Sequence, residues 1–245
     1  MLKWLRSYSL MLKWQALSQR TILPLSLVVQ IMVAVGFVIG VGFYYPQVTP
    51  TLAKFLTTGG PTIILLMVGV VLVPQMVAGA RKEGTFDYVW SLPVPRMVYV
   101  AADTTIYFLT TLPGVLLAII IGAAYYHFGL HISLLVIPGF ILTAVTGTLL
   151  GYALALGVSK PEMAQILTQV FVFVIMIFSP VIYPLSQLPG WLQGIQRALP
   201  VLYMANLTRG TLMDLPAHIG MDFAVIGAWC AAALLVVFLF VRRRK

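Results

Sequence analysis

Charged residues are scarce in this chain of 245 residues, and acidic residues are the scarcest. Charged side chains make up 9% of the sequence and only six are Asp or Glu, whereas an ordinary globular domain carries about 25% charged residues. Hydrophobic residues reach 61% and the mean hydropathy is +1.01. Because water would solvate so little of this surface, we interpret the chain as an integral membrane protein.

Sequence motifs for catalysis are absent as well. The chain contains no GxxxxGK[ST] phosphate loop and no HExxH zinc motif. Its single cysteine, Cys230, excludes an internal disulfide and a cysteine-based metal site. His127 and His131 stand four residues apart, but no Cys, Asp or Glu beside them completes a metal site. We therefore expect a chain that is not an enzyme and holds no metal or cofactor of its own.

Six apolar runs are long enough to cross a bilayer core of about 30 Å, which takes roughly 20 helical residues. They lie at 22–44, 60–79, 98–125, 132–157, 163–183 and 220–241. Together they predict an all-α integral membrane fold with six transmembrane helices, organised as one transmembrane domain over residues 1–245.

The basic residues predict the orientation of the chain in the membrane. Twelve of the 15 Lys and Arg residues fall before the first run, between the second and third, after the fourth, or at the end of the chain. By the positive-inside rule, both termini of this multi-pass protein lie in the cytoplasm, at the cytoplasmic (inner) membrane. The net charge of +9 is spread over these short segments, so we expect no nucleic-acid partner.

The first twenty residues have helical periodicity. The apolar positions follow i, i+3, i+4 and i+7 spacing, and Arg6, Lys13 and Arg20 recur every seven residues. The pattern predicts an amphipathic helix over 1–20 that lies in the lipid headgroup region of the inner leaflet. A cleaved signal peptide would instead show an unbroken apolar segment and a small-residue cleavage site.

The segment at 80–96 has the character of a folded, exposed loop. Gly84 breaks the preceding helix, Thr85 is expected to cap a short new one, and Asp87 complements the dipole of its first turn. Pro93 and Pro95 then stop it. The helix carries aromatic residues that predict either docking in the groove of a partner protein or interfacial anchoring of the third span; these residues are Phe86, Tyr88 and Trp90.

Two motif regions resemble the ABC type-2 permease family. The loop residues at 83–85, with Asp87, Pro93 and Arg96, resemble its E-x-G-T-x-[ED]-x(5)-P-x-x-R loop between spans two and three. The segment 179–203 resembles the P-L-x-x-L-P-x-W segment that precedes the last span of that family. The matching residues there are Pro184, Leu185, Leu188, Pro189, Trp191, Leu192, Pro200 and Tyr203.

The resemblance implies a permease subunit of an ATP-driven exporter. A separate cytoplasmic ATPase, present in two copies, would bind ATP and Mg²⁺. A second permease copy, giving a homodimer, would complete the path. The loop would be a coupling helix resting on the ATPase, and the loop at 159–162 a smaller second contact. The residues assigned to coupling are Glu83, Gly84, Thr85, Phe86, Asp87, Trp90, Pro93, Arg96 and Glu162.

Polar residues line one face of the fifth run and of the first, at helical spacing. Such stripes either hydrogen-bond neighbouring helices or face a cavity, and in the family the first, second and fifth spans border the path. The predicted path residues are Gln30, Phe37, Gln165, Gln169, Phe173 and Met176. Their neutral character favours a lipophilic or amphipathic substrate, such as a drug, a peptide or a lipid-like molecule. The alternatives are export of a lipid-linked polysaccharide, or a channel or scaffold without an ATPase.

Residues 184–213 are too polar and too rich in proline to span the membrane. They predict an outer re-entrant helical segment that closes the exit or braces the last span, held within protein because lipid does not tolerate exposed backbone. The residues assigned to this outer gate are Pro184, Pro189, Trp191 and Pro200.

Overall fold

The computed structural model of the chain describes residues 2–21, 23–127, 129–158, 160–181, 183–213 and 218–243, and all of its regular elements in these ranges are helices. In chain order they are α1 (Leu2–Gln19), α2 (Leu23–Val35), η1 (Gly36–Gly40), η2 (Val41–Tyr44), α3 (Pro50–Met67), η3 (Val68–Leu72), α4 (Val73–Lys82), α5 (Thr85–Ser91), α6 (Arg96–Tyr126), α7 (Val136–Gly157), α8 (Pro161–Phe178), η4 (Leu185–Gln187), α9 (Gly190–Ala198), α10 (Pro200–Met213) and α11 (Ile219–Arg243).

Within the described ranges, six helical segments are long and apolar enough to cross a membrane: Pro24–Tyr44, Pro50–Lys82, Arg96–Tyr126, Val136–Gly157, Pro161–Phe178 and Ile219–Arg242. The predicted all-α fold with six spans is therefore confirmed. Residue Ile22, where the first run was expected to start, lies outside the described residues.

Two predicted span boundaries are wrong. The second span begins at Pro50 instead of residue 60, because Thr49 caps the helix by accepting a hydrogen bond from the Leu52 amide (3.3 Å) and Pro50 suits its first position. The fifth span, helix α8, ends at Phe178 instead of residue 183. Pro180 lacks the amide hydrogen that a continuing helix would use.

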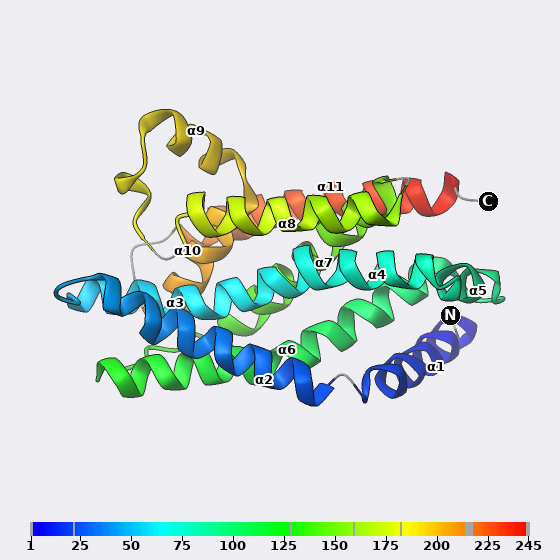
Figure 1. Ribbon diagram of the computed structural model, residues 1–245, viewed down its shortest axis with the longest axis horizontal. Helices are drawn as coiled ribbons and strands as arrows, with labels where there is room; N and C mark the ends of the chain where they lie inside the picture. The colour runs from blue at the N-terminus through cyan, green and yellow to red at the C-terminus, as the bar shows by residue number, and fades with distance from the viewer. Residues whose placement is uncertain are drawn as a thin grey trace.

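Different elements occupy the two ends of the helical bundle (Figure 1). Helices α1 and α5 and the end of α11 lie at one end of the bundle, which we call the terminal end. Helix α9 lies at the opposite end, which we call the far end. This arrangement agrees with an even number of crossings, because both ends of the described chain emerge together.

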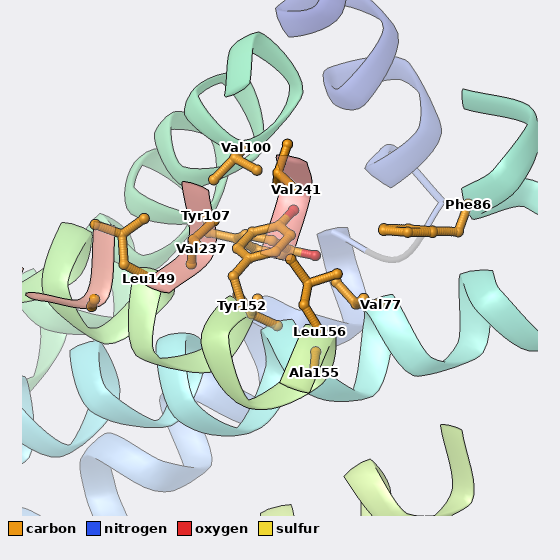
Figure 2. Close-up of a cluster of buried hydrophobic side chains, with 12 residues drawn as sticks. Val77, Phe86, Val100, Tyr107, Leu149, Tyr152, Ala155, Leu156, Val237 and Val241 are labelled. Atoms are coloured by element: carbon orange, nitrogen blue, oxygen red, sulfur yellow. The ribbon is translucent and has the colours of Figure 1, made fainter. Parts of the chain in front are cut away.

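Helix α7 is the centre of the bundle and packs against α3, η3, α4, α10 and α11. Its glycines allow direct backbone contact, since a Cβ atom on Gly151 would overlap the carbonyl oxygen of Gly69 in η3. The next residue, Tyr152, has a buried ring that belongs to one core cluster with Val237 and Val241 of α11 (Figure 2). The core is thus built where small residues bring helices close and large ones fill the remaining space.

Helix α1 lies against α6 at the terminal end. Met11 is buried against Val98 and Ala102, and the hydroxyl groups of Tyr8 and Thr105 are hydrogen-bonded at 2.7 Å. These contacts make α1 part of the folded unit, while its position in the headgroup region stays a prediction.

Candidate functional site

The predicted coupling loop contains the short helix α5, which Gly84 starts with a backbone φ of 74°. This left-handed conformation favours glycine, which has no Cβ to clash. The N-cap position is Gly84 and Thr85 is the first helical residue, so the prediction that Thr85 caps α5 is wrong. Asp87 lies in the first turn as expected, and α5 ends at Ser91, two residues before the exposed Pro93.

The aromatic residues of α5 point to different sides. Phe86 is only 2% exposed and belongs to the core cluster around Tyr152, toward which it extends in Figure 2. Trp90 packs against Phe86 with ring centroids 4.4 Å apart. The expectation that all three aromatics face a partner is therefore wrong for Phe86, because its ring is used within the chain. Tyr88, at 66% exposure, is the aromatic residue that α5 presents outward.

Two arginines tie this loop to the ends of the spans. Arg96 donates to the carbonyl of Val241 near the end of α11 (2.9 Å), and its guanidinium lies 4.8 Å from the Trp90 ring centroid. Arg81 donates to the carbonyls of Ala155 and Val158 at the end of α7, both at 2.9 Å. A cation at a helix C-terminus also complements the helix dipole. The two ends of the loop are thus attached to α7 and α11.

The second predicted contact lies beside the first. Glu162, in the first turn of α8, forms an ion pair with Lys82 at the end of α4 (3.4 Å). Both side chains are about half exposed, so the pair adds little to stability but brings the start of α8 next to the coupling loop. Ser159, from the same predicted contact, lies outside the described residues.

Three of the predicted path residues, Gln30, Gln165 and Gln169, line two separate grooves. Between α2 and the α3–η3 segment is a groove of about 370 Å³ whose lining is apolar except for Ser26 and Gln30. On the other side of η3 and α4, a shallow groove of about 340 Å³ is lined by Gln75, Gln165, Ile166 and Gln169. Helices α3 and α4 lie between α2 and α8 (Figure 1). One copy of the chain therefore does not join the two stripes into one path.

The remaining path residues have mixed surroundings. The amide of Gln30 bridges α2 to α6: it donates to the Thr110 carbonyl (3.0 Å) and accepts from the Gly114 amide (3.2 Å). Phe37 is partly buried and packs against Ile63 and Val181. Two others lie on α8 and are exposed within one copy of the chain, Phe173 at 64% and Met176 at 39%.

The predicted outer gate lies at the far end. Pro184 and Pro189 precede η4 and α9, Trp191 is 67% exposed on α9, and Pro200 begins the buried helix α10. Helix α9 is held by a hydrogen bond from the Trp229 indole to the Ala198 carbonyl (3.2 Å). Whether the segment enters the membrane stays a prediction.

Sequence analysis missed several buried polar residues. Asp103 is 3% exposed and accepts a hydrogen bond from Tyr152 across to α7. Arg209 is 5% exposed, lies over the Phe55 ring (4.1 Å) and donates to the carbonyls of Pro180 and Val181. The sequence contains a pattern that points to a buried polar site at Asp103, because tyrosines stand four residues before and after it on the same helix face.

Comparison with known proteins adds a family assignment to this geometry. The family model described as ABC-2 type transporter matches residues 6–213, which include the loop, α8 and the outer segment. A search of the curated proteins found no match. Since the family match spans most of the chain, this multi-pass membrane protein belongs to the ABC-2 type transporter permease family and is a membrane subunit of an ABC transporter.

Proposed function

We propose that the chain is the permease subunit of an ABC exporter and couples ATP hydrolysis in a separate subunit to movement of a lipophilic or amphipathic substrate. The observation that carries this proposal is the α5 loop, whose inner face is anchored in the core by Phe86 while its outer face carries exposed groups. A partner that pushes on such a rigid loop would move α7 and α11 through Arg81 and Arg96.

The docking face for the ATPase is formed by exposed residues at the terminal end. Glu83, Asp87 and Tyr88 are exposed on or beside α5, and Glu162 is exposed beside Lys82. An exposed aromatic rimmed by carboxylates suits a protein partner with basic residues around an apolar pocket. This places the terminal end in the cytoplasm, as the basic residues predict, with ATP and Mg²⁺ held by the two ATPase subunits.

A second copy of the chain would complete the path. Only 11% of the apolar window of α8 is buried within one chain, and 22% of the windows of the α2 span and of α11. A Cβ atom on Gly36 or Gly40, near the end of the first span, would meet no atom within 4 Å. These faces could remain in lipid, but glycines at GxxxG spacing favour close contact between helices. We therefore place the homodimer contact on α2 and α8.

The groove beside α2 supports a lipophilic substrate. Its volume of about 370 Å³ is that of a small-molecule site. The side-chain amide of Gln30, which lines this groove, is already hydrogen-bonded to α6. Most of the other lining side chains are those of Val, Leu, Ile and Met. An apolar molecule would exchange lipid contacts for protein contacts there at little cost.

Export of a lipid-linked polysaccharide is the second candidate. The observation in its favour is the amide-lined groove on α4 and α8, because Gln75, Gln165 and Gln169 can donate to and accept from sugar hydroxyl groups. The two candidates differ in which groove the transported molecule needs, so Gln169→Leu would impair a glycan more than an apolar drug.

Co-purification tests the proposal. The tagged chain, expressed in its own host and extracted in mild detergent, should recover a phosphate-loop ATPase at about one per permease, with measurable ATP hydrolysis. Tyr88→Ala should reduce this recovery at least fivefold. Tyr44→Ala is the matched control, since Tyr44 is 86% exposed near the far end. A clean oligomer without an ATPase would contradict the proposal and favour a channel or scaffold.

A further inference from the structure

A cavity of about 240 Å³ lies at the terminal end, behind the predicted coupling helix and apart from both grooves. Four segments enclose it: α1, α4, the loop and helix at Glu83 to Val89, and α6. The volume is more than ten times the roughly 15 Å³ that one water molecule requires. The cavity can therefore hold a small organic molecule.

Two carboxyl groups line the cavity in an otherwise basic protein. Glu83 and Asp103 line it, and none of its described lining residues is Lys, Arg or His. Asp103 is 3% exposed and takes its hydrogen bond from the neutral hydroxyl of Tyr152. A buried carboxylate without a cation is costly, so a positively charged ligand would gain a strong partner here.

Aromatic rings provide a second feature of cation recognition. Trp14, Phe86, Tyr99 and Tyr107 all line the cavity, with the Trp14 and Tyr99 ring centroids 6.4 Å apart. The faces of such rings attract organic cations, and cages of aromatic residues bind alkylated ammonium groups. A hydrated metal ion would gain less from these walls than an ammonium group that carries carbon atoms.

A buried amide adds a third, independent feature. Gln15 is 5% exposed and lines the cavity, and its Nε2 donor approaches the Tyr99 hydroxyl without forming a hydrogen bond of good geometry. Burying an unpaired donor costs about 1–3 kcal/mol, and an acceptor oxygen on a ligand would remove that cost. The ligand that fits all three features carries an ammonium group and an oxygen a few bonds away.

We propose that this cavity is a binding site for an amino alcohol of the choline or ethanolamine type, either free in solution or as the headgroup of a phospholipid. The ammonium group lies among the aromatic rings against Asp103, and the oxygen accepts from Gln15. An occupant bridges α1, α4, α5 and α6, so binding stiffens the support behind Phe86. The site does not depend on the identity of the transported substrate.

Two binding measurements on the full-length chain test the proposal and separate the two sources. Radiolabelled choline is titrated onto the detergent-purified protein at constant ionic strength. In parallel, native mass spectrometry compares phosphatidylethanolamine with phosphatidylglycerol retained after extraction from nanodiscs that contain equal amounts of both. The test variant is Asp103→Asn, which keeps the side-chain shape and an acceptor for Tyr152. The control is Asp222→Asn, another aspartate with 3% exposure, on α11.

We expect saturable binding in at least one arm, weakened at least tenfold by Asp103→Asn and unchanged by Asp222→Asn. Choline binding identifies a soluble source, and selective retention of phosphatidylethanolamine identifies a lipid. Trp14→Leu, at a residue 37% exposed, removes one aromatic wall without opening the core and should weaken binding about threefold or more. Absence of binding in both arms, or equal binding by Asp103→Asn, would overturn the proposal.

Discussion

Helices α7 and α8 follow each other in the chain and have the same mean hydropathy of 1.7, but they are covered very differently. Within one copy of the chain, 67% of the apolar window of α7 is buried and only 11% of that of α8. Hydropathy therefore identifies segments that can enter a membrane, but does not say whether protein or lipid will surround them.

Side-chain size explains much of this difference. Helix α7 presents Gly147, Gly151 and three buried threonines to its neighbours, so other backbones approach it closely. Helix α8 presents large side chains such as Phe171, Phe173 and Ile177, which remain exposed. A helix with small residues is suited to the centre of a bundle, whereas α8 offers a broad surface that a second chain can cover.

The strongest test of this contrast is Gly151→Ala. The added Cβ would overlap the carbonyl oxygen of Gly69, and overpacking of this kind costs about 1–3 kcal/mol. We expect a clear fall in the midpoint of thermal unfolding in detergent. Gly227→Ala in α11 is the control, because its Cβ would meet no atom within 4 Å. Equal midpoints for the two variants would contradict the packing of α7 against η3.

The ends of the two helices offer a second test, because each is capped by an arginine. Arg209, 5% exposed, donates to two carbonyls just beyond α8, whereas the partly buried Arg81 donates to two at the end of α7. Arg209→Gln should cost about 2 kcal/mol by leaving buried carbonyls unpaired, and Arg81→Gln should cost less because the Arg81 side chain is only partly buried. Chemical unfolding of both variants measures the difference, and the reverse order would count against it.

Substitution on α8, which other helices of the same chain cover least, should separate function from stability. Gln169 is exposed on α8, so Gln169→Leu should leave the unfolding midpoint unchanged. It should lower ATP hydrolysis stimulated by a glycan substrate severalfold, and ATP hydrolysis stimulated by an apolar substrate less. The assay uses proteoliposomes with the co-purified ATPase. A large loss of stability with normal activity would assign Gln169 to helix packing instead of the path.

The smallest expected effect concerns the ion pair between α4 and α8. Because Lys82 and Glu162 are about half exposed, Glu162→Gln should not shift the unfolding midpoint. It should instead slow ATP hydrolysis modestly if the start of α8 is a second docking contact. Normal hydrolysis in this variant would remove Glu162 from the coupling surface.

Much of the fold could be predicted from the sequence, because six spans leave long apolar runs that no other local pattern imitates. Helix ends were predicted less well, since they depend on single interactions such as the Thr49 cap and the break at Pro180. The loop at 80–96 was identified by its glycine, prolines and motif. The inward direction of Phe86 was not, because it requires knowing that α5 packs against α4 and joins the core cluster around Tyr152.

The buried polar groups illustrate the limit of local patterns. Asp103 lies near the start of α6, and only the packing of α6 against α7 brings it to Tyr152. Likewise, the Gln30 and Gln165 stripes were both recognisable at helical spacing, but their separation by α3 and α4 is a property of the tertiary fold.

Cysteine cross-linking of the uncovered helices tests the central claim, which is that a second copy covers α2 and α8. In a Cys230→Ala background, single cysteines replace Met32 on α2, Phe173 on α8 and Leu116 on α6, all more than half exposed. We predict oxidative dimers in membranes when the chain with Cys at position 32 on α2 is co-expressed with the chain with Cys at position 173 on α8, and few when either is paired with the α6 control. Dimers only in the pairs that include the α6 control, or in no pair, would contradict the account.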